Sequence, residues 1–132
     1  MVRLYDKESH KEALESISRM EEQVTLLSAV RTIQTGVFRA NATQAASLRK
    51  GLQGATIDLV FTDIPYGQHS QWEGTQTPHP AWAMLEALFE YISPKSILAI
   101  TSDKLQKIAH EKYERLERFQ LGKRQVVILR PA

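Results

Sequence analysis

Apolar residues recur along the chain at two spacings, which separate the expected helices from the expected strands. Steps of three and four residues predict a long helix over 9–27 and a second helix that starts at Pro80 and ends before Pro94. Shorter helices are expected over 42–50 and 103–110. The apolar stripes of the two longer helices consist of Leu14, Ile17, Met20, Val24 and Leu27, and of Trp82, Leu85, Leu88, Phe89 and Ile92.

Runs of β-branched and apolar residues predict the strands. They cover 31–38, 57–62, 96–101, 113–121 and 124–130. The run 57–62 is almost continuously apolar, which is typical of a strand buried on both faces of a parallel sheet. Gly122-Lys123 separates the last two runs and predicts a hairpin. Helices alternating with strands indicate a single α/β domain over 1–132, with a mainly parallel sheet that ends in an antiparallel hairpin.

Composition narrows the class of protein. The 132 residues are 42% hydrophobic and 24% charged, as in an ordinary globular domain. The absence of cysteine excludes a disulfide framework, a thiol nucleophile and a cysteine-ligated zinc, and the four scattered histidines predict no metal site. No apolar run approaches the roughly 20 residues of a membrane helix, and no signal peptide is evident at the start of the chain. We therefore expect a cytoplasmic protein with no membrane partner.

Charge is distributed unevenly. The net charge is +2, but residues 103–132 hold eight lysines and arginines against four acids. This basic end is either a solvated face or a surface that contacts phosphate groups.

One short motif suggests chemistry. Asp63-Ile64-Pro65-Tyr66 follows directly after the apolar strand 57–62, and ligands of open α/β sheets bind beyond the carboxyl ends of the strands. Proline stiffens this turn, so that a carboxylate and an aromatic ring project from one edge. That pair suits an extruded nucleobase, and a carboxylate favours the adjacent N1–H and N2–H donors of guanine. The alternative interpretation is a simple proline turn after a strand.

A strand followed by D-I-P-Y resembles motif IV of the amino methyltransferases, which use S-adenosylmethionine. The longer run 58–67, followed by Trp72-Glu73-Gly74, resembles the AviRa family of 23S rRNA guanine methyltransferases, which is linked to avilamycin resistance. The resemblance covers essentially the whole chain but only the carboxyl-terminal half of the family domain. It implies an incomplete Rossmann-like class I methyltransferase fold, lacking the first two strands and the glycine-rich loop.

The resemblance also implies roles for individual residues. Asp63, Ile64, Pro65 and Tyr66 would be the catalytic residues at the junction of target base and methyl donor. The substrate-binding loop would contain Gly67, His69, Trp72 and Glu73. Trp72 has a second interpretation, as an apolar anchor that packs its loop down. The implied activity is methylation of a guanine in 23S rRNA, with rRNA as the partner.

The chain departs from the family pattern on the cofactor side, because no G-x-G occurs in it. We therefore expect S-adenosylmethionine to bind the complete family domain but not this chain alone. Residues 31–38 are expected to pair directly with 57–62 in a five-stranded sheet; otherwise a second copy or a complementing amino-terminal fragment covers the two edges. A non-catalytic α/β remnant or an RNA or protein interaction module is the alternative function, and a DNA adenine methyltransferase is a weaker third.

Overall fold

The fold is seen in a computed structural model, in which residues 8–65, 71–74 and 77–132 are described. The chain divides into two compact units, Met1–Val37 and Phe38–Ala132. In chain order, the elements are α1 (Glu8–Val30), α2 (Ala45–Leu52), β1 (Ile57–Asp63), α3 (Pro80–Phe89), β2 (Ile92–Asp103), β3 (Tyr113–Leu121) and β4 (Arg124–Pro131).

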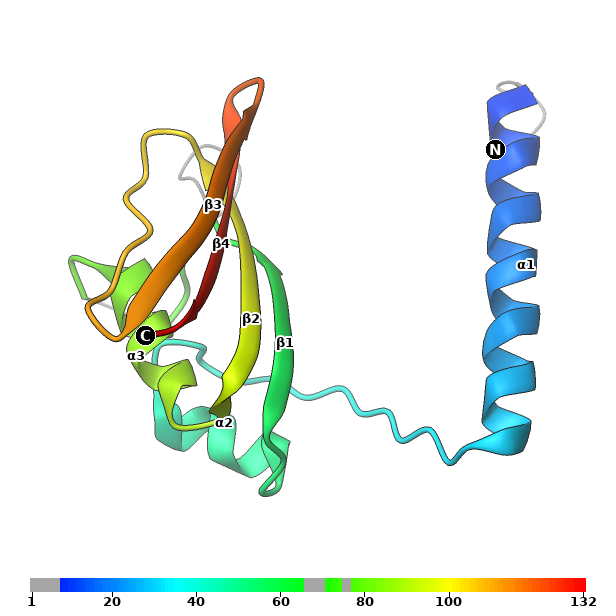
Figure 1. The fold of residues 1–132 in the computed structure, drawn as a ribbon, viewed down its shortest axis with the longest axis horizontal. Helices are drawn as coiled ribbons and strands as arrows, with labels where there is room; N and C mark the ends of the chain where they lie inside the picture. The colour runs from blue at the N-terminus through cyan, green and yellow to red at the C-terminus, as the bar shows by residue number, and fades with distance from the viewer. Residues whose placement is uncertain (1–7, 66–70, 75–76) are drawn as a thin grey trace. The chain divides into compact units, whose positions relative to one another are not determined.

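The second unit is built on a four-stranded sheet in the order β1-β2-β4-β3. Strands β1 and β2 are parallel and joined through α3, whereas β2–β4 and β4–β3 are antiparallel. Helices α2 and α3 lie on the same face of this sheet (Figure 1). The α/β class and the carboxyl-terminal hairpin are therefore confirmed, and the described sheet is mixed rather than mainly parallel.

The core lies between the sheet and these helices. Leu98 and Ile100 of β2 and Val127 and Leu129 of β4 point to the covered face and are at most 1% exposed. They belong to one cluster with the fully buried Leu85 of α3. The alternation of buried and less buried positions along β2 and β4 is that of strands with one covered face.

The expected strand 31–38 is not formed, so the prediction of a five-stranded sheet is wrong. Among the described residues no strand pairs with this segment, and β1 is an edge strand. Strand propensity alone does not hold a segment extended in a sheet, because the ladder needs a partner. Instead, the ring of Phe38 lies over Gly51 of α2, where any larger residue would collide with it.

Strand β1 is not buried on both faces, contrary to its sequence pattern. Leu59 is 63% and Phe61 is 82% exposed, both on the face opposite the helices. Their neighbours in register, Ile97 and Ala99 of β2, are half-buried. The apolar run thus marks a face that no layer of the described part of the second unit covers.

The expected helix 103–110 is replaced by an irregular segment. The buried amide of Gln125 donates to the backbone carbonyls of Asp103 and Gln106, at 3.1 and 2.6 Å. The Asp103 carboxylate accepts from the Leu105 N–H at 2.8 Å. These side chains therefore form hydrogen bonds with backbone groups that would pair with one another in a helix.

The described part of the first unit contains α1, and the predicted helix is confirmed. It has no buried residues, and its apolar stripe is exposed, with Leu14 at 57% and Val24 at 55%. Within this unit the described residues form no second element against which the stripe could pack.

Candidate active site

The described part of the predicted motif, Asp63-Ile64-Pro65, lies at the carboxyl end of β1. Ile64 is 3% exposed, and its N–H donates to the carbonyl of Thr101 on β2 at 2.9 Å. Asp63 pairs in register with Thr101 and is the last residue of the strand. Since Pro65 follows, the backbone beside the Asp63 carboxylate is fixed on both sides.

Asp63 faces a basic residue from the hairpin. An oxygen of its carboxylate lies 3.7 Å from a guanidinium nitrogen of Arg124, and both side chains are about half exposed. An exposed ion pair of this length contributes little to stability. The Asp63 carboxylate is thus partly exposed at the carboxyl end of β1.

Three of the predicted site residues, Tyr66, Gly67 and His69, lie outside the described residues. Their roles stay predictions from the sequence.

The Trp72-Glu73-Gly74 segment is tied to the chain that leads into α2. The Gly74 carbonyl accepts from the Asn41 amide at 2.8 Å, and Glu73 lies 3.8 Å from Arg39 with both side chains largely exposed. Trp72 packs against the core cluster, and its buried indole N–H has no partner among the described residues. This packing agrees with the anchor interpretation of Trp72, and a role toward substrate stays a prediction.

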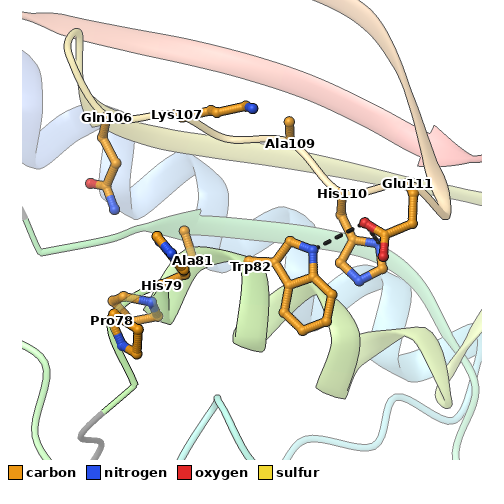
Figure 2. Close-up of a pocket in the computed structure, with 10 residues that line it drawn as sticks. Pro78, His79, Ala81, Trp82, Gln106, Lys107, Ala109, His110 and Glu111 are labelled. Carbon is orange, nitrogen blue, oxygen red and sulfur yellow. Dashed lines mark hydrogen bonds and ion pairs between the residues drawn. The ribbon is translucent and has the colours of Figure 1, made fainter.

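A groove that the sequence did not predict opens between the start of α3 and the segment 106–111. Figure 2 shows its lining, and its volume is about 880 Å³. Trp82 stands in its wall and is 41% exposed, although the helical spacing placed it in a buried stripe. The indole N–H donates to the Glu111 carboxylate at 3.1 Å, and the ring stacks on the His110 imidazole with centroids 4.6 Å apart.

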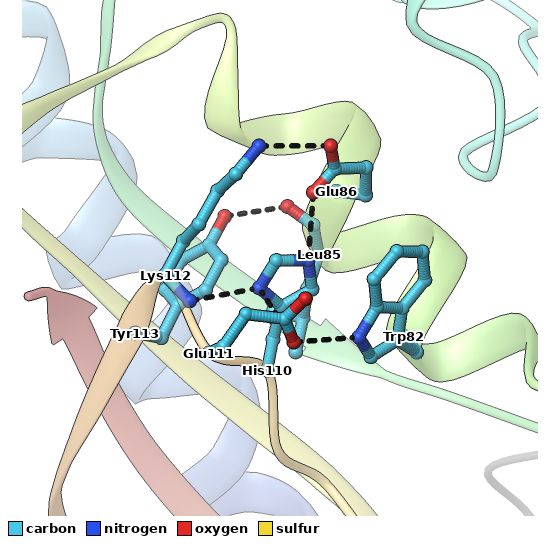
Figure 3. A network of polar contacts seen from close by, with 7 residues as sticks. All are labelled: Trp82, Leu85, Glu86, His110, Glu111, Lys112 and Tyr113. Atoms are coloured by element: carbon cyan, nitrogen blue, oxygen red, sulfur yellow. Dashed lines mark hydrogen bonds and ion pairs between the residues drawn. The ribbon is translucent and has the colours of Figure 1, made fainter.

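A polar network behind this groove fixes His110 (Figure 3). The imidazole is completely buried; its Nδ1 accepts from the Lys112 N–H at 3.0 Å, so its Nε2–H donates to Glu86 at 2.7 Å. The Lys112 amine donates to the other Glu86 oxygen at 2.8 Å. The hydrogen bond from Lys112, and then that from His110, lowers the pKa of Glu86 below its usual range. The ionised Glu86 carboxylate therefore accepts hydrogen bonds from both Lys112 and His110 and holds the two side chains in place.

Tyr113 anchors the same network to α3. Its hydroxyl donates to the Leu85 carbonyl at 2.6 Å, and burial raises the pKa of Tyr113. We expect Tyr113→Phe to lower the free energy of unfolding by about 1–2 kcal/mol, because it removes a buried hydrogen bond. Urea unfolding measures the change, and Tyr91→Phe, which removes a part-buried bond to Ala45, is a control with a smaller expected loss. Equal stabilities of Tyr113→Phe and the parent would contradict the importance of this bond.

No group of three or more histidine, aspartate and glutamate side chains in the described segments is arranged to hold a metal ion. No helix among them has the length and apolar character to cross a membrane.

The sheet order and the helices on one face together define part of a Rossmann-like class I methyltransferase fold. A putative methylase from Haemophilus influenzae shares this fold, with a TM-score of 0.54 over 86% of this chain and 65% of that protein at 16% identity. The family model described as rRNA methyltransferase AviRa matches residues 1–124, and the chain belongs to this family.

Two comparisons within the family are closer. The chain is 32% identical to the 23S rRNA (guanine(2535)-N(1))-methyltransferase of Streptomyces viridochromogenes over 133 aligned residues, 97% of this chain and 50% of the relative. The 1.5 Å structure of rRNA methyltransferase AviRa from the same organism matches with a TM-score of 0.65 and 27% identity, over 98% of this chain and 51% of that one. The chain thus spans about half the length of the relatives it matches.

Proposed function

We propose that this chain is the carboxyl-terminal part of an enzyme that methylates a guanine in 23S rRNA with S-adenosylmethionine. The observation that carries the proposal is the position of Asp63-Ile64-Pro65 at the carboxyl end of β1, bonded to β2, in a chain of the AviRa family. The ribosomal substrate places the activity in the cytoplasm, and its product is a modified site of the kind linked to antibiotic resistance.

Asp63 is the residue that orients the base. Its half-exposed carboxylate can accept both the N1–H and the amino N–H of guanine, which lie side by side. The relative is named for methylation at guanine N1, and we propose the same nitrogen here. N1 carries a proton in the neutral base, and the Asp63 carboxylate can accept this proton as N1 takes up the methyl group. Most of the remaining acceleration comes from holding N1 in line with the methyl group.

The other residues of the motif shape the site around the base. Ile64 and Pro65 give the turn its rigidity, since Ile64 is buried and bonded to β2. Tyr66 supplies a stacking face for the extruded base. Gly67, His69, Trp72 and Glu73 belong to the loop on the substrate side, which Trp72 anchors to the core.

The described residues fit the base but not the cofactor. Cofactors of this fold class are held by a glycine-rich turn between a strand and a helix, and the glycines with positive φ here, Gly54, Gly74 and Gly122, each stand alone. We propose that the cofactor is bound by an amino-terminal half, on the same polypeptide or on a separate one.

The uncovered face of the sheet is where this half would pack. Leu59 and Phe61 of β1 are exposed there, beside half-buried Ile97, Ala99 and Ile128. An exposed apolar face of this kind marks an interaction surface. A homodimer that covers the face with a second copy is the alternative arrangement.

Calorimetry tests whether the amino-terminal half is needed to bind the cofactor. We expect no saturable binding of S-adenosylmethionine to these 132 residues at micromolar concentrations, and binding once the amino-terminal half of the family domain is added. Stoichiometric binding to the 132 residues alone would show that the cofactor site has been placed on the wrong half.

The activity itself is tested by methyl transfer in vitro. The two halves together, incubated with labelled S-adenosylmethionine and 23S rRNA, are expected to label guanine, whereas either half alone is not. Transfer by the amino-terminal half without this chain would overturn the proposal.

A further inference from the structure

The groove beside Trp82 holds its aromatic ring in a fixed orientation. His110 covers one face of the indole, and Glu111 holds its N–H, yet the residue is 41% exposed (Figure 2). One face of the ring is therefore covered, and the exposed part of Trp82 borders this groove and a smaller neighbouring hollow. His110 is itself buried and bound by Glu86 and by the backbone of Lys112. Because His110 and Glu111 already fix the orientation of the ring, Trp82 loses little conformational entropy when a ligand stacks on it.

The polar groups around the ring suit the edge of a nucleobase. The Gln106 amide offers both a donor and an acceptor, and one oxygen of the Glu111 carboxylate is not used by the indole. Lys107 is exposed at the rim and can meet a phosphate. A volume of about 880 Å³ is within the range of sites that enclose small ligands.

Charge beside the groove favours nucleic acid over a protein segment. Behind the same loop, a shallow hollow is lined by four basic side chains, Lys104, Lys107, Arg115 and Arg118. Lys107 lines both the hollow and the groove. Basic side chains next to an exposed aromatic face are the combination by which proteins bind single-stranded nucleic acid.

We propose that this groove binds one unpaired nucleotide of RNA, with its base stacked on the outward face of Trp82 and its phosphate near Lys107. The choice of RNA rests on the proposed function, whereas the stacking site itself does not depend on methyl transfer. Asp63 does not line this groove. The nucleotide bound at Trp82 is therefore distinct from the target guanine at Asp63 and serves to position the RNA.

The test measures binding of a fluorescein-labelled, eight-nucleotide single-stranded RNA to the 132-residue chain by anisotropy. We expect Trp82→Ala and Trp82→Leu to weaken binding about five- to a hundredfold, and Trp82→Phe to retain most of it, because the aromatic face is what binds. Phe119→Ala is the matched control, since Phe119 is 39% exposed on β3 and lines no part of the groove, and its affinity is expected to be unchanged. The same RNA as a duplex is expected to bind more weakly because its bases are already stacked.

The inference is overturned if the parent chain does not bind the single-stranded RNA, or if Trp82→Leu and Trp82→Phe bind it with equal affinity. It is also overturned if substitutions of Trp82 weaken only the binding of the amino-terminal half, because the groove would then be a protein interface. Circular dichroism of each variant shows whether it is folded. If the assembled halves transfer the methyl group but Trp82→Leu binds RNA as tightly as the parent chain, this inference is wrong and the proposed function stands. RNA binding that depends on Trp82, without any methyl transfer, would instead remove the proposed function.

Discussion

Asp63→Ala is expected to lower the rate of guanine methylation by about ten- to a hundredfold in the enzyme assembled from both halves. The substitution removes a charge-assisted hydrogen bond to the base, which is worth about 1.5–3 kcal/mol in the transition state. The fold should persist, because the Asp63 side chain is half exposed and its ion pair with Arg124 spans 3.7 Å. Single-turnover methyl transfer at saturating RNA measures the chemical step apart from binding.

Two further variants refine this experiment. Asp63→Asn keeps the size of the side chain and one acceptor, so a loss similar to that of alanine shows that the charge matters. Asp58→Ala is the matched control, because Asp58 is an exposed acid on the same strand, away from its carboxyl end. Full activity of Asp63→Ala would remove Asp63 from the site.

Tyr66→Ala is expected to reduce methylation severely, whereas Tyr66→Phe should be mild. Stacking of a base on an aromatic ring is worth about 1–3 kcal/mol, and phenylalanine keeps the ring while losing the hydroxyl. The comparison is made in the same methyl-transfer assay. Equal losses in the two variants would instead indicate a tyrosine that acts by hydrogen bonding.

Local sequence patterns predicted the elements whose partners are also close in the chain. Strands β3 and β4 follow from two β-rich runs around Gly122, and α3 follows from apolar spacing after a proline. The position of Asp63 at the end of β1 was predictable because an apolar run stops there. Each of these features is determined by short-range geometry.

The errors concern features that depend on distant partners. Segment 31–38 has the composition of a strand, but no neighbour supplies the ladder among the described residues. Leu59 and Phe61 have the pattern of buried residues, yet the pattern does not say whether a covering layer is present. In both cases the residues have the strand propensity that the pattern indicates, but the described residues supply no neighbouring strand or covering layer for them.

The groove at Trp82 was missed for a related reason. It arises from contacts between residues that are far apart in the sequence: His110 contacts Glu86, 24 positions away, and Glu111 contacts Trp82, 29 positions away. The expected helix 103–110 would have carried these side chains elsewhere, but hydrogen bonds from the Gln125 amide and to the Asp103 carboxylate hold this segment in another conformation. A tryptophan at helical spacing gives no local sign of whether it faces the core or a groove.

The most direct test is mass spectrometry of 23S rRNA from cells with the gene intact and from cells in which the gene is deleted. The account predicts one methylated guanine in the first RNA that is unmethylated in the second, at a site that regains its methyl group when the natural gene is restored. Identical methylation of every guanine in the two RNAs would contradict a catalytic role for this chain and would favour a non-catalytic interaction module.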